Sequence, residues 1–492
     1  MNEIRPTRHI VRATGIIGAA SIINIAVGMV RTKLIAVTLG AAGVGRIGLL
    51  ISLMTTAAAA AAWGIGNTGA RSVAGAGPPE EMATARRALA IAAIALALVG
   101  AAAVYALRIP LARWLLGSDA AAPLVGWTAI GVGCSVIGFA QNGLLTGLKR
   151  VGDLARVSAA SAVIVTALSV PIVLFFGEAA IVPYVLLGPI VTVAVGAYFI
   201  GRLPRPGAGL QFGALAAQWR HMLSLGTALT TASLAVLGGQ LAIRVIVQHD
   251  LGLPAVGLFQ ASFAISVNYV GLALGALSTD YYPRLVPHLK EPEVLRRLVN
   301  GQASVSLLLA APLIVAAIGF APWMIALLYA PSFAPAAEML RWQLLGDVLR
   351  IAGWPLSFVL LPAGRGTAFA TNEAATMAIG VLVTALLVPR YGIAGAGIAY
   401  CVMYGAYLVS LNLLARRHAH PVWEQRTVLL WLLVGGSALL TLGISALSAR
   451  AGMAVSAFCS AALAILALRH LRDALPPKLQ EILDRAVPRL RA

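Results

Sequence analysis

Apolar residues dominate the chain in long continuous runs, and polar residues gather in short clusters between them. The stretches 91–107, 307–318 and 428–447, for example, carry no Asp, Glu or Lys. A helix needs about 20 mainly apolar residues to cross the hydrocarbon core of a bilayer. The runs are rich in Ala and Leu and do not alternate with period two, so they predict membrane-spanning helices rather than the strands of a barrel.

The pattern predicts an all-α polytopic membrane protein with about 14 transmembrane helices in two pseudo-symmetric lobes around a central cavity. The tenth helix is the most polar, because Glu338, Arg341, Asp347 and Arg350 interrupt it. The predicted helices are 13–38, 46–70, 86–107, 123–148, 156–176, 181–201, 220–246, 256–281, 295–319, 336–361, 368–388, 392–415, 427–448 and 452–469.

Composition supports this interpretation. The chain is 60% apolar and only 11% charged, and its mean hydropathy is +0.89. A soluble domain carries roughly a quarter of charged residues. The net charge of +19 could indicate nucleic-acid binding, but basic cytoplasmic loops are the rule in membrane proteins, so we expect no nucleic-acid partner.

The positions of the basic residues give an orientation. Of the 36 Lys and Arg residues, 26 lie at helix ends and loops on the side of the N-terminus, five lie on the opposite side and five lie within helices. Cytoplasmic loops are enriched in Lys and Arg, so both termini are predicted to be cytoplasmic. The five on the outer side are Arg46, Arg108, Arg113, Arg390 and Arg450.

A short internal repeat suggests two related halves. The segments 39–45 and 251–257 both have the form LGxxxVG, and each joins a helix that ends outside to one that returns. Repeated halves are a transporter design with the substrate path between them. The predicted organisation is an N-lobe over 1–201 (helices 1–6), a cytoplasmic linker over 202–219, a C-lobe over 220–415 (helices 7–12), and helices 13–14 with a cytoplasmic tail over 416–492.

Cations inside helices are the main candidate binding groups, because intramembrane charges are costly and mark pathways or pairs. Arg31 lies eight residues before Leu39, and Arg244 lies seven before Leu251. The two cations are therefore predicted to face the interlobe space at similar depth, unless they extend to the headgroups. Lys33 is about 200° around the helix from Arg31 and points elsewhere.

The acidic candidates lie in the second half. Asp347 and Arg350 are spaced to pair on one helix face, which is either a structural salt bridge or a carboxylate that titrates or binds a cation. Arg350 remains a substrate-binding candidate. Glu373 is a second coupling candidate, and Asp280 is a gating candidate that is more simply part of an interfacial network with Arg284.

Neutral polar groups and motifs complete the inventory. Gln141, Asn142 and Asn268 could bind sugar hydroxyls or hold helices together. The three cysteines lie in apolar runs without metal-ligand spacing. Walker A, GxSxG and HExxH motifs are absent, and the longest outer loop, predicted at about 320–335, is too short for a catalytic domain. We therefore expect neither an enzyme nor a cofactor or metal.

The map and its motifs resemble the Wzx-type oligosaccharide flippases of the polysaccharide transporter family, in the MOP superfamily shared with MATE exporters and MurJ lipid II flippases. The resemblance spans nearly the whole chain. The resembling segments are RTKLIA at 31–36, LG at 39–40, GVG at 43–45, GL at 48–49, DYYPRL at 280–285, residues 333–342, LGD at 345–347, residues 364–373 and YGIAGA at 391–396.

The resemblance implies transport, by alternating access, of an undecaprenyl-pyrophosphate-linked oligosaccharide (an O-antigen, capsule or exopolysaccharide unit) from the cytoplasmic to the periplasmic leaflet of the bacterial inner membrane. Its implied partners are this substrate and membrane lipids, with a polysaccharide polymerase and a chain-length regulator as candidates. Coupling to a proton or sodium gradient stays open. Arg31, nine residues before Gly40, matches a cavity-lining Arg of the lipid II flippases.

Other functions remain open. The lipid II flippases also carry an Arg early in helix 8, and residues 259–263 have none, so lipid II is disfavoured unless Arg244 takes that role. A cation-coupled drug exporter of the MATE type needs acidic residues in its cavity. Helices 1–6 have none in their interiors, which favours an anionic substrate. A sugar ligase or an assembly scaffold is less well supported.

Overall fold

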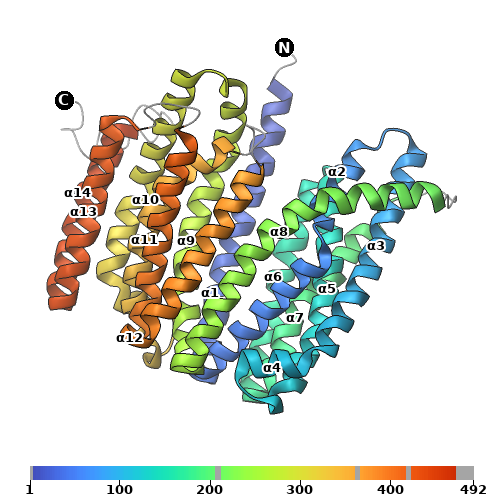
Figure 1. Cartoon of the computed structure of the whole chain (residues 1–492), viewed down its shortest axis with the longest axis horizontal. Coiled ribbons are helices and arrows are strands. Elements are labelled where there is room, and N and C mark those ends of the chain that lie inside the picture. Colours follow the sequence, from blue (N-terminus) through green and yellow to red (C-terminus); the bar gives the residue numbers. More distant parts are fainter. Residues whose placement is uncertain (1–3, 205–211, 361–365, 417–422, 472–492) are drawn as a thin grey trace. The chain divides into compact units, whose positions relative to one another are not determined.

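The computed structural model describes residues 4–204, 212–360, 366–416 and 423–471. Within these ranges every regular element is a helix, which confirms the all-α fold class (Figure 1). The α-helices are α1 (Ile4–Ala62), α2 (Ile65–Gly75), α3 (Pro79–Ala106), α4 (Arg108–Leu116), α5 (Ala122–Gly147), α6 (Val151–Phe176), α7 (Ile181–Gly201), α8 (Phe212–Leu251), α9 (Leu253–Leu285), α10 (Pro292–Leu328), α11 (Ala336–Leu360), α12 (Gly366–Ala415), α13 (Gln425–Leu447) and α14 (Ala449–Leu471). Short 3₁₀ turns are η1 (Asp119–Ala121), η2 (Gly177–Ala180), η3 (Val286–His288) and η4 (Pro331–Phe333).

Helices α1 and α12 each contain two helices separated by a single glycine. Gly40 has φ 62° and Gly392 has φ 58°, a conformation that glycine adopts without steric cost. With these breaks, thirteen of the fourteen predicted segments each correspond to one helix in the described chain. The predicted helix 46–70 is wrong, because α1 ends at Ala62 and α2 begins at Ile65, after Trp63 and Gly64 adopt left-handed φ angles. Helix α11 coincides with the predicted helix 336–361 despite its charged residues.

Two predicted connections are shorter than the sequence indicates. Helix α10 continues to Leu328, so most of the predicted outer loop 320–335 is helical. The apolar residues of this stretch extend the helix beyond Pro322, because neighbouring groups in membrane proteins tolerate such a proline. Helix α8 begins at Phe212, within the predicted linker 202–219.

The chain forms two compact units. Unit 1 comprises Met1–Leu258 with Leu328–Ser332, and unit 2 comprises Phe259–Leu327 with Phe333–Ala492. The division falls in α9, after the repeated LGxxxVG segment. The lobe boundaries that the sequence suggests stay a prediction.

Small residues allow close helix packing in unit 1. A Cβ at Gly143 of α5 would collide with the carbonyl of Gly66 in α2, and one at Gly147 would crowd Ala70. Close backbone approach through small residues is typical of helix association in membranes, where the hydrophobic effect does not drive it.

The two LGxxxVG segments pack against each other within unit 1. A Cβ at Gly45 would collide with the carbonyl of Leu253, and a Cβ at Gly257 would collide with the carbonyl of Ala41. Ala41 and Leu253 occupy the same position of the motif, and so do Gly45 and Gly257. The contact is therefore reciprocal, as in a twofold-related pair, and the internal repeat has a structural counterpart here.

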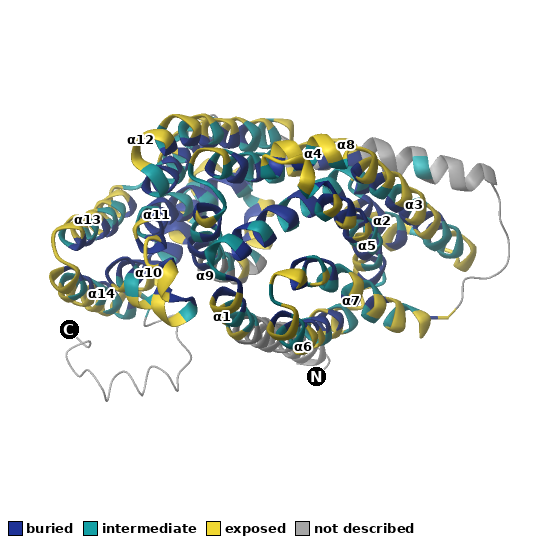
Figure 2. Cartoon of the chain, turned by 90° about the horizontal axis from the view of Figure 1, so that it is seen from below, coloured by how far each residue is buried: buried dark blue, intermediate teal, exposed yellow. Residues whose placement is uncertain are grey.

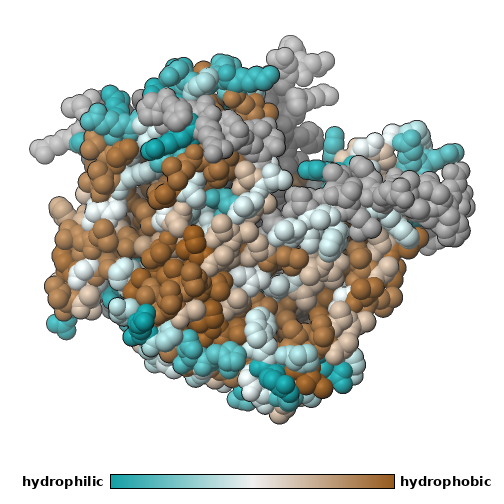
Figure 3. Space-filling view, in the orientation of Figure 1, coloured by the Kyte–Doolittle hydropathy of each residue, from teal (hydrophilic) through white to brown (hydrophobic). Residues whose placement is uncertain are grey.

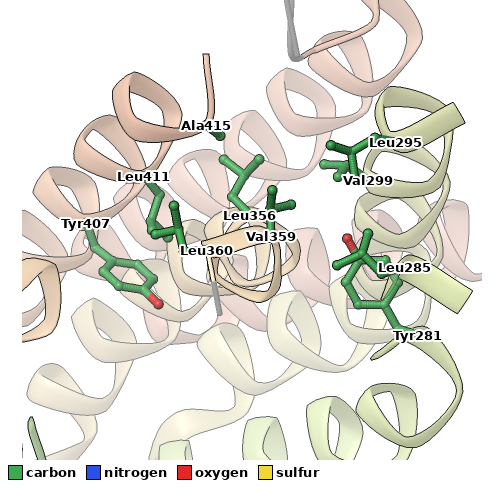
Figure 4. Packing of buried hydrophobic residues seen from close by; sticks show 10 residues of the cluster. All are labelled: Tyr281, Leu285, Leu295, Val299, Leu356, Val359, Leu360, Tyr407, Leu411 and Ala415. Atoms are coloured by element: carbon green, nitrogen blue, oxygen red, sulfur yellow. The ribbon is translucent and has the colours of Figure 1, made fainter. Parts of the chain in front are cut away.

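Unit 2 has a hydrophobic cluster built from four helices (Figure 4). Tyr281 of α9 is fully buried and donates its hydroxyl hydrogen to the carbonyl of Pro355, 3.0 Å away. The hydrogen bond satisfies the polar end of an otherwise apolar anchor. The cluster consists of Tyr281, Leu285, Leu295, Val299, Leu356, Val359, Leu360, Tyr407, Leu411 and Ala415.

The outward faces of the helices are apolar. Figure 2 shows exposed residues along α3, α13 and α14, and these include Leu98, Leu432 and Phe458, which are 66%, 67% and 76% exposed. Figure 3 shows apolar surface over the middle of the helices and hydrophilic surface towards their ends. Eight helical stretches in the described residues are long and apolar enough to cross a membrane. Such faces need a hydrocarbon environment, and the chain is a multi-pass membrane protein.

Candidate functional site

Arg31 is a half-buried cation in the first half of α1. Its guanidinium carbon lies 5.9 Å from the ring centroid of Tyr184 in α7, which is within the range of a cation–π contact. Its Nε atom is buried and has no hydrogen-bond partner. Among the described residues no carboxylate forms an ion pair with it. The site therefore holds a net positive charge with a donor available.

The other two cations predicted in unit 1 have different surroundings. Lys33 is exposed, and the spacing of two residues places it on another side of α1. Arg244 of α8 is only 4% exposed and donates from Nη1 to the carbonyl of Gln240 at 2.9 Å. The repeat aligns Arg31 with Ile243 rather than with Arg244, so the two arginines are offset by one residue. One residue is about 100° around a helix, which accounts for their unlike environments.

Gln141 and Asn142 are neighbours in α5 with distinct roles in the structure. Gln141 donates from Nε2 to the carbonyl of Val193 in α7 at 3.2 Å, and its amide packs where Gly196 leaves room. This contact joins two helices, one of the two roles that the sequence allows. Asn142 is exposed and lines a cavity in unit 1. The side chains of Asn268 and Asp280 lie outside the described residues.

Asp347 is the centre of a polar cluster in unit 2. Its carboxylate is fully buried and accepts hydrogen bonds from Ser266 Oγ at 2.6 Å and from the Tyr400 hydroxyl at 2.9 Å. Arg350, one turn along α11, has Nη1 3.8 Å from Asp347 Oδ1. That distance gives an ion pair rather than a hydrogen bond. A buried carboxylate needs this combination of donors and an opposite charge.

Aromatic hydroxyls extend the cluster towards Glu373. The Arg350 guanidinium lies 5.5 Å from the ring centroid of Tyr404. Glu373 of α12 is half-buried, lies near Tyr407 and interacts electrostatically with Arg350. The structure thus brings together three of the predicted residues, Asp347, Arg350 and Glu373, in unit 2.

Sequence reasoning missed several polar residues. Gln343, one turn before Asp347, is fully buried, and neither its Oε1 nor its Nε2 has a hydrogen-bond partner. The Nδ2 atom of Asn372, beside Glu373, is likewise buried and unpaired. Their spacing from the two carboxylates could have identified them. Tyr184 and Tyr400 carry no such signal, because they are distant in sequence from Arg31 and Asp347.

The Arg31 site and the Asp347 cluster suit different chemistry. Arg31 offers an uncompensated guanidinium that can bind a phosphate oxygen through its fork of donors. The Asp347 cluster holds charges of both signs, so it can exchange a proton or cation only if its contacts rearrange. No group of three His, Cys, Asp or Glu suited to a metal ion occurs in the described residues.

Solved structures share the fold at low sequence identity. Lipid II flippase MurJ in an inward closed conformation aligns with a TM-score of 0.69 and 10% identity over 92% of this chain and 99% of that one. A multidrug resistance MATE family transporter of the MOP superfamily in an inward-facing conformation aligns with a TM-score of 0.66 and 16% identity. The alignment covers 83% of this chain and 98% of that one. A MOP superfamily transporter from Pyrococcus furiosus aligns with a TM-score of 0.58 and 17% identity, over 85% of this chain and 96% of that one.

Sequence comparisons identify relatives and a family. The Lipid III flippase of Escherichia coli is 26% identical over 172 residues, which is 33% of this chain and 40% of that protein. The Lipid III flippase of Shigella flexneri gives the same values. The chain therefore matches less than half of the length of these relatives. The family model described as "Polysaccharide biosynthesis protein" matches residues 79–338, more than half of the chain. On this match, the chain belongs to the polysaccharide biosynthesis protein family.

Proposed function

We propose that this chain is a flippase for an undecaprenyl-pyrophosphate-linked oligosaccharide, the repeat unit of an O-antigen, capsule or exopolysaccharide. It moves this lipid from the cytoplasmic to the periplasmic leaflet of the bacterial inner membrane by alternating access. The family match, the fold shared with MurJ and MATE transporters, and the partial match to Lipid III flippases support the proposal. The observation that carries it is the uncompensated Arg31 in a membrane helix.

Arg31 has the chemistry that a pyrophosphate requires. An arginine at the centre of a membrane helix costs about 2.5–3.5 kcal/mol on insertion scales, so its retention there implies a partner. The Tyr184 ring satisfies only part of the guanidinium, and the buried Nε lacks an acceptor. A pyrophosphate supplies several anionic acceptor oxygens, and arginine keeps its charge when water is excluded. Arg31 is therefore assigned to the pyrophosphate group.

The remaining cations are assigned secondary roles. Arg244 is almost inaccessible, so it contacts substrate only after the rearrangement that alternating access involves. Arg350 is already paired with Asp347 and contributes less to substrate binding. Lys33 assists from another side of α1, and its loss has a smaller effect than the loss of Arg31.

Transport of labelled substrate in vesicles tests the proposal. Purified protein is reconstituted with fluorescent undecaprenyl-pyrophosphate oligosaccharide, and a membrane-impermeant lectin measures its appearance in the opposite leaflet. Wild type is expected to transfer the lipid, Arg31→Ala to lose transfer, and Arg31→Lys to retain part of it because the charge remains. Arg46→Ala is the matched control, since Arg46 lies in the second half of α1 and pairs with Glu178. Unimpaired transfer by Arg31→Ala would contradict the assignment.

Asp347 and Glu373 are the proposed coupling carboxylates, for either protons or sodium. Both lie buried or half-buried in one cluster with Arg350, so protonation or cation binding would alter its charge balance. Asp347→Asn and Glu373→Gln keep the shape of each side chain. They are expected to abolish the response of transport to an imposed proton or sodium gradient. A normal response in both variants would exclude the two carboxylates from coupling.

A cation-coupled drug exporter is the second candidate, favoured by the buried carboxylate of Asp347. The ion pair with Arg350 weakens it, because that carboxylate is not available to a cationic drug. Efflux of ethidium from cells that express the chain distinguishes the two. A flippase leaves ethidium retention unchanged, whereas an exporter reduces it. The predicted orientation, with both termini cytoplasmic, can be tested with cysteine labelling by a membrane-impermeant maleimide.

A further inference from the structure

The chain breaks direction between α1 and α2, beside a cavity that the Arg31 site does not include. Trp63 has φ 46° and Gly64 has φ 71°, so the break uses the left-handed region. Gly226 of α8 packs against the carbonyl of Trp63, where a Cβ would collide. The close approach of α8 fixes the break, because only a residue without a side chain fits there.

The cavity has a volume of about 350 Å³ and lies entirely within unit 1, between α1, α2, α5 and α8. Among the described residues its polar lining groups are neutral, and none of its lining residues is charged. An exposed aromatic ring, Phe139, forms part of the wall. The polar lining residues are Asn67, Asn142, Thr146, Thr230 and Ser233.

Thr230 is the informative residue. Its side chain is only 3% exposed, and its hydroxyl has no hydrogen-bond partner. Threonine in a helix commonly bonds the carbonyl four residues earlier, as the neighbouring Thr231 does with Thr227 at 2.9 Å. A buried hydroxyl without a partner is unfavourable. Because it lines the cavity, a bound hydrogen-bonding group would satisfy it.

The two asparagines add amide groups that are free to bind a ligand. Neither Asn67 nor Asn142 has a side-chain hydrogen bond to another described residue, and both are exposed in the cavity wall. Amides and hydroxyls can both donate and accept, as sugar hydroxyls do. A few placed polar groups on an apolar wall are the usual make-up of a small-molecule site.

We infer that this cavity binds the sugar hydroxyls of the lipid-linked oligosaccharide, with Thr230 and Asn142 as the central hydrogen-bonding residues. The inference rests on the proposed function and adds a place for the neutral glycan, separate from the cation assigned to the pyrophosphate. The described lining residues are uncharged, so they suit a neutral glycan better than the pyrophosphate. Asn67 lies one turn before Arg71 and Thr146 three residues before Lys149, so the cavity is near the end that the basic residues assign to the cytoplasm.

Binding of two lipids that differ only in the sugar tests the inference. The probes are undecaprenyl diphosphate and undecaprenyl diphosphate carrying one N-acetylglucosamine, added to the full chain in nanodiscs that contain phosphatidylglycerol. Wild type is expected to bind the sugar-bearing lipid about tenfold more tightly. Thr230→Val and Asn142→Ala are expected to remove most of this preference and to leave the affinity for the sugar-free lipid unchanged.

Thr128→Val is the matched control. Thr128 is also buried in unit 1, but its hydroxyl already bonds the carbonyl of Val125 at 2.6 Å. It should keep the preference for sugar. Thr230→Val should melt at the same temperature as wild type or higher, because it removes an unsatisfied hydroxyl, so its loss of preference would not reflect misfolding.

The outcomes separate the two levels of the proposal. Wild type that binds neither lipid overturns the proposed flippase function and this site with it. Wild type that binds both lipids equally, or a preference that survives in Thr230→Val and Asn142→Ala, overturns the sugar site alone.

Discussion

Arg31 in unit 1 and Asp347 in unit 2 are both charged side chains inside membrane helices, yet their surroundings differ. Asp347 has two hydroxyl donors and a cation within its own unit. Arg31 has one aromatic ring and a buried nitrogen without an acceptor. The Asp347 carboxylate is satisfied by the protein. Arg350 Nη1 and Arg31 Nε both lack a hydrogen-bond partner, but Arg350 has an opposite charge beside it, whereas Arg31 has none among the described residues. An intramembrane charge without an opposite charge beside it is a candidate binding group.

The largest expected effect comes from breaking the satisfied cluster. Arg350→Met leaves the Asp347 carboxylate buried without its cation, which is expected to cost about 3–5 kcal/mol of unfolding free energy. Denaturation of the purified protein in detergent measures the loss. The double variant Asp347→Asn/Arg350→Met should recover most of it, because no charge remains buried. Additive losses would contradict the ion pair.

The second-largest effect is expected at the reciprocal contact between the two LGxxxVG segments. These segments occupy equivalent positions in the repeat, whereas Arg31 and Asp347 do not. Gly45→Ala and Gly257→Ala each place a Cβ against a backbone carbonyl, and each is expected to cost about 1–3 kcal/mol. Gly188→Ala in α7 is the control, since nothing lies within 4 Å of its Cβ position. If only one of the two motif variants were destabilised, the contact would not be reciprocal.

Loss of Arg31 should impair transport with little effect on stability, the opposite of what is expected for Arg350. Arg31→Ala removes a cation–π contact of about 1 kcal/mol and also removes an unsatisfied nitrogen, so the unfolding free energy should change by less than about 1 kcal/mol. Melting temperatures in detergent should therefore be nearly unchanged while transport is lost. A large destabilisation would mean that Arg31 supports the fold rather than the substrate.

The smallest effect is expected at the surface pair of Arg46 and Glu178. The two side chains are 3.4 Å apart, and that of Glu178 is 76% exposed. Such pairs contribute about 0–1 kcal/mol and are screened by salt. Arg46→Ala should shift the melting temperature little, and the shift should shrink further in 1 M NaCl. A shift comparable with that of Arg350→Met would contradict the expectation that the exposed pair stabilises the fold less than the buried pair of Asp347 and Arg350.

Sequence alone predicted thirteen of the fourteen helices with their approximate ends and the repeated LGxxxVG motif, whereas the reciprocal contact of its glycines came from the structure. The helices and the motif depend on local properties: the transfer of side chains into hydrocarbon adds along a run, and glycine permits a sharp break such as Gly40 wherever it stands. The predicted outer loop 320–335 was too long, because α10 tolerates Pro322 and continues to Leu328.

Only the tertiary structure decided which polar group is satisfied. Ser266 and Tyr400 lie 81 and 53 residues from Asp347, and no periodicity in sequence links them. The same holds for Tyr184 beside Arg31 and for Thr230, whose sequence context does not distinguish it from Thr231. Hydrogen bonds and ion pairs require partners within a few ångströms, and distance in space between residues remote in sequence is set by packing alone.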